Sequence, residues 1–155
     1  MIDVVAKLNE LGWAMPTPPP PVASYVPVVI TGSLALVSGQ LPFDSGALIS
    51  TGPVPSVVAE EQAQRAAQQC IVNALASLGV ALDHDWSRLI RIVRIGVFVQ
   101  SDDGYGQQPT VANGASDLLF DVFGEAGRHV RAAVGVNALP LNATVEIELT
   151  AEVRS

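Results

Sequence analysis

Residues 130–153 read VRAAVGVNALPLNATVEIELTAEV, and this C-terminal stretch decides the fold class. From Thr144 to Val153 apolar and polar residues alternate, which is the pattern of a strand with one buried and one polar face. The preceding run, Val130 to Val136, holds only small and β-branched residues besides Arg131, and it predicts another strand. Pro140 lies between the two runs, so we expect a turn that joins them into an antiparallel hairpin.

Two helices and a long strand are predicted upstream of this stretch. Apolar residues recur at helical spacing between Ala59 and Leu78, and Gly79 is expected to end that helix. Residues 115–123 predict a second helix, which Gly124 is expected to stop. Between the helices, the β-branched run from Leu89 to Val99 predicts a long buried strand.

The N-terminus, residues 1–22, is expected to form a helix and an arm. Apolar residues at helical spacing predict a helix over 2–11, with Gly12 as its stop. The proline-rich run from Pro16 to Pro21 forbids regular structure and favours an extended polyproline II arm.

Residues 23–155 are expected to hold the main body of what is a single domain overall. Tyr25 to Thr31 and Leu34 to Ser38 predict a hairpin, and a short strand over 47–50 could follow. After the first helix the element order is therefore β-β-α-β-α-β-β. This order favours an α+β fold, a mixed β-sheet with two main helices on one face.

Composition and charge narrow the classes of function. The 155 residues are 49% apolar and carry a net charge of -7, and Lys7 is the only lysine. Binding of nucleic acid through phosphates needs the opposite balance, so no nucleic-acid partner is expected. The longest apolar run, Val26 to Ile30, is far shorter than the roughly 20 residues of a membrane helix, so no membrane partner is expected either.

The same features favour an oligomer in the cytoplasm. A mean hydropathy of +0.38 is high for a small acidic chain, and we expect a neighbouring subunit to cover part of the apolar surface. Asp3, Lys7 and Glu10 interrupt the first ten residues, which therefore lack the apolar region of a signal peptide. The single cysteine, Cys70, cannot form an internal disulfide.

No metal site or cofactor is expected from the sequence. His84 and His129 are 45 positions apart, and neither has the spacing of a zinc site. His129 is most simply a loop or strand-end residue, and Cys70 is expected to pack in the core. A nucleophile elbow, a P-loop and a dinucleotide fingerprint are all missing.

Arg131 stands out because its neighbours in the predicted strand are small and apolar. In the predicted hairpin it would point away from the helices, opposite Glu148 and diagonal to Glu146 at about 7 Å. Two interpretations remain open. The side chain could form a cross-strand ion pair with a glutamate, or its planar donors could bind a substrate carboxylate.

Six short motifs repeat the pattern of a known family in the same order, over about residues 20–153. They are Tyr25, Ser38-Gly39-Gln40-Leu41-Pro42, Asn113-Gly114-Ala115-Ser116-Asp117, Arg131-Ala132-Ala133-Val134, Leu139-Pro140 and Val145-Glu146. On these motifs the sequence resembles the RidA family, also called YjgF/YER057c/UK114. The N-terminal helix, the proline-rich arm and the motif at Asn113 resemble its longer, endoribonuclease L-PSP-like subgroup.

The resemblance implies a chorismate-mutase-like α+β fold assembled as a homotrimer, with clefts between adjacent subunits. It also implies hydrolytic deamination of reactive 2-enamino and 2-imino acids, such as 2-aminoacrylate, to 2-keto acids and ammonia without a cofactor. One alternative is a noncatalytic trimer that binds small carboxylates. Another is an endoribonuclease or translation inhibitor, against which the acidic composition argues.

The resemblance also assigns expected roles to single residues. Arg131 matches the arginine that binds the substrate carboxylate, and Glu146 matches the glutamate that positions the attacking water. Tyr25, Ser38 and Asn113 match other positions that line the cleft. The chain departs from the family at two places. Ala133 stands where many members have a cysteine, which excludes a thiol-dependent reaction, and an extra residue lies between Asn113 and Arg131.

Overall fold

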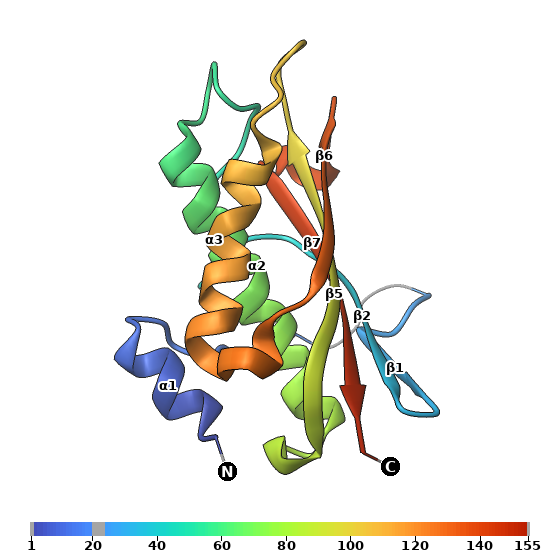
Figure 1. Ribbon diagram of the computed structural model, residues 1–155. Coiled ribbons are helices and arrows are strands. Elements are labelled where there is room, and N and C mark those ends of the chain that lie inside the picture. Colours follow the sequence, from blue (N-terminus) through green and yellow to red (C-terminus); the bar gives the residue numbers. More distant parts are fainter. Residues whose placement is uncertain (1, 20–23, 155) are drawn as a thin grey trace.

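The protein folds into two layers, a sheet and a pair of helices on one of its faces (Figure 1). The computed structural model describes residues 2–19 and 24–154. The sheet has the strand order β1-β2-β7-β5-β6, and a small hairpin, β3-β4, lies apart from it. The strands are β1 (Val28–Thr31), β2 (Leu34–Gln40), β3 (Phe43–Asp44), β4 (Ala47–Leu48), β5 (Leu89–Gln100), β6 (Val130–Val136) and β7 (Val145–Val153). This confirms the predicted α+β class with a mixed sheet and two main helices on one face.

The predicted C-terminal hairpin is wrong, although both of its strands form. β6 pairs in parallel with β5, and β7 lies between β2 and β5 and is antiparallel to both. A helix of 16 residues connects β5 to β6, and a crossover of that length is what two parallel strands need. The alternation along a strand therefore identified the strand and its buried face, but it did not identify the partner.

The longer of the two main helices, α2 (Glu60–Ala81), continues past the predicted stop. Gly79 lies inside the helix, where a Cβ would come within 3.0 Å of the Trp86 ring. Leu82, which follows the last helical residue, is fully buried, so the final turn contributes to the core. Gly79 thus provides space for an aromatic side chain instead of ending the helix.

The second main helix, α3 (Gln108–Phe123), begins seven residues before the predicted start at residue 115. Its first turn contains Pro109, which is well tolerated there because that amide has no helical partner. It ends as predicted at Gly124, whose φ of 59° lies in the left-handed region. At Gly114 the two helices touch: a Cβ there would lie 2.5 Å from the carbonyl oxygen of Gln64 on α2.

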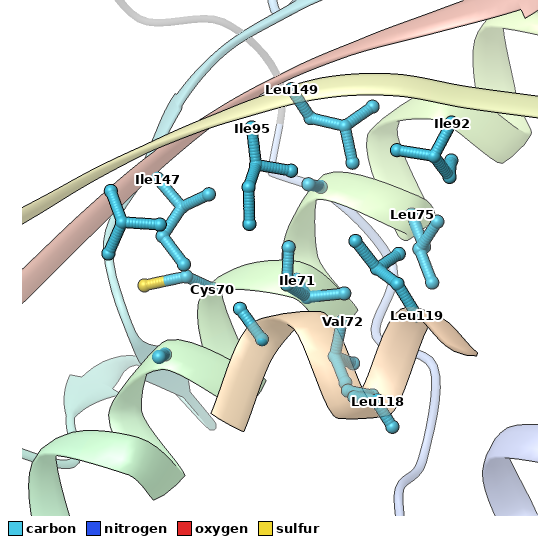
Figure 2. Close-up of a cluster of buried hydrophobic side chains, with 14 of the residues drawn as sticks. Cys70, Ile71, Val72, Leu75, Ile92, Ile95, Leu118, Leu119, Ile147 and Leu149 are labelled. Carbon is cyan, nitrogen blue, oxygen red and sulfur yellow. The ribbon is translucent and has the colours of Figure 1, made fainter. Parts of the chain in front are cut away.

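The hydrophobic core fills the space between the helices and the sheet (Figure 2). Ile71 and Leu75 of α2 and Leu119 of α3 meet Ile95 and Ile147 from the two central strands, and all five are fully buried. Cys70 points into the same core, as predicted, and burial raises the pKa of its thiol well above the usual value. The thiol is therefore protonated and has a packing role.

The N-terminal helix, α1 (Val4–Glu10), packs against α3. The Asp3 carboxylate caps its first turn, and Val4 and Leu8 are fully buried. Pro16 to Pro19 have no regular secondary structure, and the rest of the predicted polyproline arm lies outside the described residues. β1 begins at Val28 instead of the predicted Tyr25, since Pro27 has no amide hydrogen to donate to a strand partner.

In the described part of the chain no helix covers the opposite face of the sheet (Figure 1), which carries apolar side chains beside the charged ones of β5 and β7. We call it the open face. Its large exposed apolar side chains, each between 40% and 66% accessible, are Val29, Leu34, Leu36, Val130 and Val134. Exposed apolar side chains gathered on one sheet face mark an interaction surface. In the described part of the chain, no helix is long and apolar enough to cross a membrane.

Candidate functional site

Arg131 lies at the start of the edge strand β6 and points toward α3. Its register partner on β5 is the buried Ile95, so the side chain is on the helix-covered face of the sheet. The guanidinium donates hydrogen bonds to Ser116 Oγ and Asn113 Oδ1, each at 2.9 Å, and to the Pro109 carbonyl oxygen at 3.3 Å. The expected position opposite Glu148 is therefore wrong, because β5 separates β6 from β7.

Among the described residues, the positive charge of Arg131 has no carboxylate partner. The ion pairs within residues 2–19 and 24–154 are Lys7 with Glu10, Arg94 with Glu148, and Arg128 with Glu125. All three hydrogen-bond acceptors of Arg131 are neutral. Since a guanidinium has five N–H donors, two of them have no partner in the described part of the chain. Of the two interpretations of this side chain, the cross-strand ion pair is thereby excluded.

The helix α3 supplies a platform for the guanidinium. Pro109, Asn113 and Ser116 are spaced four and three residues apart, so they share one helix face. The expected pairing of Arg131 and Asn113 in one site is thus found in the structure. Ser116 was not among the expected site residues, although it stands in the same motif as Asn113, three positions further on.

His129 extends this group of residues. Its Nε2 lies 2.9 Å from Ser116 Oγ, and its Nδ1 lies 2.7 Å from the Gly127 carbonyl oxygen. Burial is the main cause that lowers the pKa of His129, and the nearby Arg131 charge adds to it, while the bond to Gly127 opposes both. The imidazole is therefore held in its neutral form. We call Asn113, Ser116, His129 and Arg131 the arginine cluster.

Glu146 lies on the open face, in β7. A Cβ at Gly39 of the neighbouring strand would overlap the Glu146 carboxylate, so this glycine leaves the room that the carboxylate occupies. Burial and the adjacent Glu148 charge raise the pKa of Glu146, burial having the larger effect. Within the described residues no group donates a hydrogen bond to this carboxylate, which is free to accept one from water.

Glu148 follows Glu146 on the same face and is already paired. It accepts a hydrogen bond from Arg94 Nη1 at 2.8 Å. Gly96 makes space for this pair, because a Cβ there would come within 2.7 Å of the Glu148 carboxylate. The two glutamates therefore differ: one is neutralised by an arginine and the other is not.

Ser38 precedes Gly39 in β2, and Tyr25 lies in the segment before β1 to which Ser38 bonds. The Ser38 hydroxyl donates a hydrogen bond to the Val26 carbonyl oxygen at 2.9 Å and so ties β2 to the segment before β1. Tyr25, in that segment, is 59% exposed. We call Tyr25, Ser38 and Glu146 the glutamate cluster.

The two clusters do not meet within one chain. Arg131 is level with Ile95 of β5, whereas Glu146 is level with Phe98, three residues further along. Three residues along a strand and two strand spacings across the sheet put their Cα atoms roughly 14 Å apart. The side chains also point to opposite faces of the sheet. One copy of the chain therefore does not bring the arginine and the glutamate to the same ligand.

A cleft in the described part of the chain lies away from both clusters. It has a volume of about 440 Å³ and lies beside α2, where the Arg65 guanidinium sits 4.2 Å from the centre of the Trp13 ring. No residue of the arginine or glutamate cluster lines it. In the described part of the chain, no three His, Cys, Asp or Glu side chains gather into a group that could hold a metal ion.

Comparisons with known proteins agree with the motifs. The family model described as endoribonuclease L-PSP matches residues 15–153. The chain belongs to this family. The match includes every residue of the arginine and glutamate clusters. Similar structures include the YjgF gene product of E. coli, so the resemblance to the RidA/YjgF family is confirmed.

Individual proteins also resemble the chain over most of its length. Protein TCP17 from Trypanosoma cruzi is 39% identical over 98% of this chain and 95% of its own. A protein of unknown function from Agrobacterium tumefaciens is 45% identical, with a TM-score of 0.93, over 97% of this chain and 92% of its own. E. coli TdcF, solved with bound serine, is 26% identical, with a TM-score of 0.63, over 90% and 94%.

Proposed function

We propose that this endoribonuclease L-PSP family member is an enamine/imine deaminase. It hydrolyses reactive 2-enamino and 2-imino acids to 2-keto acids and ammonia, without a cofactor, in a cleft between subunits of a homotrimer. The observation that carries the proposal is Arg131, a guanidinium held in place by neutral acceptors and left without an acidic partner. Such a group binds a carboxylate through charge-assisted hydrogen bonds without first breaking an ion pair.

The site needs a second copy of the chain. Arg131 and Glu146 lie too far apart within one copy, and they point to opposite faces of the sheet. The open face carries the exposed apolar side chains of β1, β2 and β6 in the same region as the Glu146 carboxylate. Packing of this face of one copy against the β6 edge of its neighbour would bury that surface and bring the glutamate cluster of one subunit to the arginine cluster of the other.

The reaction requires few catalytic groups, because an imine carbon is already electrophilic. An enamine takes a proton on its methylene carbon from solvent and becomes an imine. Arg131 binds the carboxylate, and Glu146 accepts a proton from a water whose oxygen bonds to the imine carbon. Glu146 returns this proton to the nitrogen, the C–N bond breaks, and ammonia leaves as the carbonyl forms, while the proton of the new hydroxyl group goes back to solvent. The sum consumes one water and yields one keto acid and one ammonia.

The raised pKa of Glu146 suits this role. A carboxylate with a higher pKa is a stronger base toward water once it is ionised. The bound serine in the TdcF structure supports a small amino-acid-like ligand, since serine carries the same carboxylate next to a nitrogen-bearing carbon. The substrate class proposed here has that arrangement of groups.

A coupled assay tests the proposal. A PLP-dependent dehydratase acting on serine releases 2-aminoacrylate, and keto-acid formation is followed with and without the protein. We expect an acceleration over buffer that falls about 100-fold in Arg131→Ala, which loses at least two charge-assisted hydrogen bonds to the carboxylate. Arg91→Ala, which removes an exposed arginine of β5 outside both clusters, should retain the activity. No acceleration, or full activity in Arg131→Ala, would refute the deaminase.

The same protein preparation separates two other functions. Binding of a keto acid in a calorimeter without any turnover would favour a noncatalytic trimer that binds carboxylates. The family description names an endoribonuclease. A chain with a net charge of -7, however, offers few cationic side chains to which RNA phosphates could bind. Cleavage of RNA that survives stringent purification and disappears in Arg131→Ala would replace the deaminase with a nuclease.

A further inference from the structure

The hydrogen bonds of the arginine cluster form one continuous chain. Arg131 Nη1 donates to Ser116 Oγ at 2.9 Å, Ser116 Oγ lies 2.9 Å from His129 Nε2, and His129 Nδ1 lies 2.7 Å from the Gly127 carbonyl oxygen. This series of hydrogen bonds begins at the Arg131 guanidinium, which can only donate, and ends at the Gly127 carbonyl oxygen, which can only accept. These two ends decide where every proton between them lies.

For a neutral imidazole, only one arrangement of protons satisfies all three bonds. His129 carries its proton on Nδ1 and donates it to Gly127, because a carbonyl oxygen can only accept. Its Nε2 is then a bare acceptor, and the Ser116 hydroxyl donates to it. A lone pair of Ser116 Oγ is left to accept the bond from Arg131. The neutral ring is thus in the Nδ1–H form.

A proton on Nε2 would break this arrangement. Ser116 Oγ would then face two cationic donors, Arg131 and the imidazolium. Its own hydroxyl proton would have no acceptor within this series of hydrogen bonds. Repulsion between the two cations would push the guanidinium away from α3. The lowered pKa of His129 has the same physical origin, burial together with the Arg131 charge.

Other charged groups lie on the elements packed around His129. α3 carries Asp117 and Asp121, both exposed, and β5 carries Arg91, which donates to the Arg128 carbonyl oxygen. Arg128 itself is paired with Glu125 at 3.0 Å. The ring nitrogens of His129 bond to Ser116 and Gly127.

We propose that Ser116 and neutral His129 are positioning residues that hold the Arg131 guanidinium ready for a carboxylate, so that protonation of His129 weakens carboxylate binding. The inference rests on the proposed role of Arg131 as the carboxylate-binding group. Asn113 and Pro109 anchor one terminal nitrogen of the guanidinium, and the Ser116–His129 pair anchors the other. With both anchored the guanidinium plane cannot rotate, and its remaining donors keep a fixed direction.

The test measures pyruvate binding by calorimetry between pH 5 and 8 in the full-length protein. Pyruvate stays ionised over this range, so the protein causes any change. We expect the Kd to rise about tenfold as His129 is protonated. In His129→Gln the amide oxygen can still accept from Ser116 but does not titrate, so the Kd should stay near the high-pH value of the unmodified protein. Any pH dependence contributed by Glu146 would persist in that variant.

Two serine variants and one control complete the set. Ser116→Ala should weaken pyruvate binding about tenfold at pH 8 and remove the effect of His129, while Ser116→Thr, which keeps the hydroxyl, should restore both. Asp117→Asn, an exposed neighbour on α3 outside the chain of bonds, should bind as the unmodified protein does. A Kd that does not change across the titration of His129, or Ser116→Ala binding with full affinity, would overturn the inference.

Nitrogen NMR gives a readout that does not depend on activity. With histidine labelled by 15N, and His84→Gln to assign the two rings, His129 should show a protonated Nδ1 and a bare Nε2 at neutral pH. An Nε2–H form would contradict the inference even if pyruvate binds. If the unmodified protein neither binds pyruvate nor accelerates enamine hydrolysis, the proposed function fails first and this inference fails with it. If the protein hydrolyses the enamine but its Kd for pyruvate does not depend on pH, this inference is wrong and the proposed function stands.

Discussion

The neutrality of the acceptors around Arg131 sets what this side chain can do. An acidic partner would satisfy the guanidinium and would compete with any incoming carboxylate. A hydroxyl, an amide oxygen and a carbonyl oxygen fix its direction without removing its charge. Two side chains and a backbone oxygen thus orient one cation, whereas a single glycine, Gly39, leaves room for the Glu146 carboxylate.

The glycine beneath Glu146 provides a residue-scale prediction. In Gly39→Ala the new methyl group would occupy the place of the Glu146 carboxylate, which has to swing aside. We expect kcat for enamine hydrolysis to fall about tenfold or more, because a displaced base no longer orients the water. The thermal midpoint should change little, since the displaced group is the end of a flexible side chain.

Gly106→Ala is the matched control for this substitution. No atom outside its own chain neighbours lies within 4 Å of a Cβ at Gly106, so the added methyl has open space. Equal activity of the two alanine variants would contradict the role given to Gly39. The sequence could name Arg131 and Glu146 from motifs, but the reason for Gly39 is a contact between two strands. No local pattern encodes such a contact.

At the scale of one element, β7 holds two carboxylates of different character on its open face. Glu148 is neutralised by Arg94, yet its charge still raises the pKa of Glu146. Glu148→Gln removes this charge and frees the positive Arg94, and both changes favour the ionised form of Glu146. The pKa of Glu146 should fall, so the base stays ionised to lower pH and the acidic limb of kcat moves to lower pH.

A pH profile of enamine hydrolysis measures this shift. Glu152→Gln, four residues beyond Glu148 on the same face of β7, is the matched control and should leave the limb where it is. If the acidic limb of the kcat profile does not shift in Glu148→Gln, or shifts to higher pH, Glu146 is not the titrating base.

The contact between α2 and α3 gives a second element-scale prediction. Alanine normally stabilises a helix interior by about 1 kcal/mol relative to glycine. At Gly114, however, the added Cβ would lie 2.5 Å from the Gln64 carbonyl oxygen, and backbone cannot yield as a side-chain end can. We expect Gly114→Ala to lower the free energy of unfolding by about 1 to 3 kcal/mol. Urea denaturation measures it, and an increase in stability would contradict the close helix contact.

Most elements could be predicted from the sequence, because each strand and helix shows its own period. The errors have common physical causes. Gly79 is a stop signal in isolation, but the Trp86 ring packs on it and the helix continues. α3 begins early because Gln108 and Val111, which the pattern missed, are buried. The pairing of β6 with β5 depends on where α3 returns the chain, and the pattern within one strand does not contain that information.

At the scale of the whole molecule, the proposed function needs copies of the chain to associate through the open face. Val134 is 45% exposed there, and a charge at its position would be buried by the proposed packing. Val134→Glu should therefore dissociate the proposed trimer, and sedimentation velocity should show single copies. Enamine hydrolysis should be lost with it, since no second copy supplies the other cluster.

Val80→Glu is the control for this variant. Val80 is 52% exposed on α2, in the helix layer, so a charge there should leave the assembly and the activity unchanged. An unmodified protein that sediments as a single copy, or a dissociated Val134→Glu that keeps its turnover, would disprove the shared cleft. The sequence predicted surplus apolar surface from composition, but only the fold gathers it on one face.

The place of β6 at the margin of the sheet has one more consequence. Among the described strands only β5 bonds to it, so along its other side the amides have no strand partner. A ligand that binds the Arg131 guanidinium would therefore stabilise the edge strand β6. Deuterium uptake at the amides of residues 130–136 would then be slower when the site is occupied. Ligand binding could be followed from these amides without any chemical turnover.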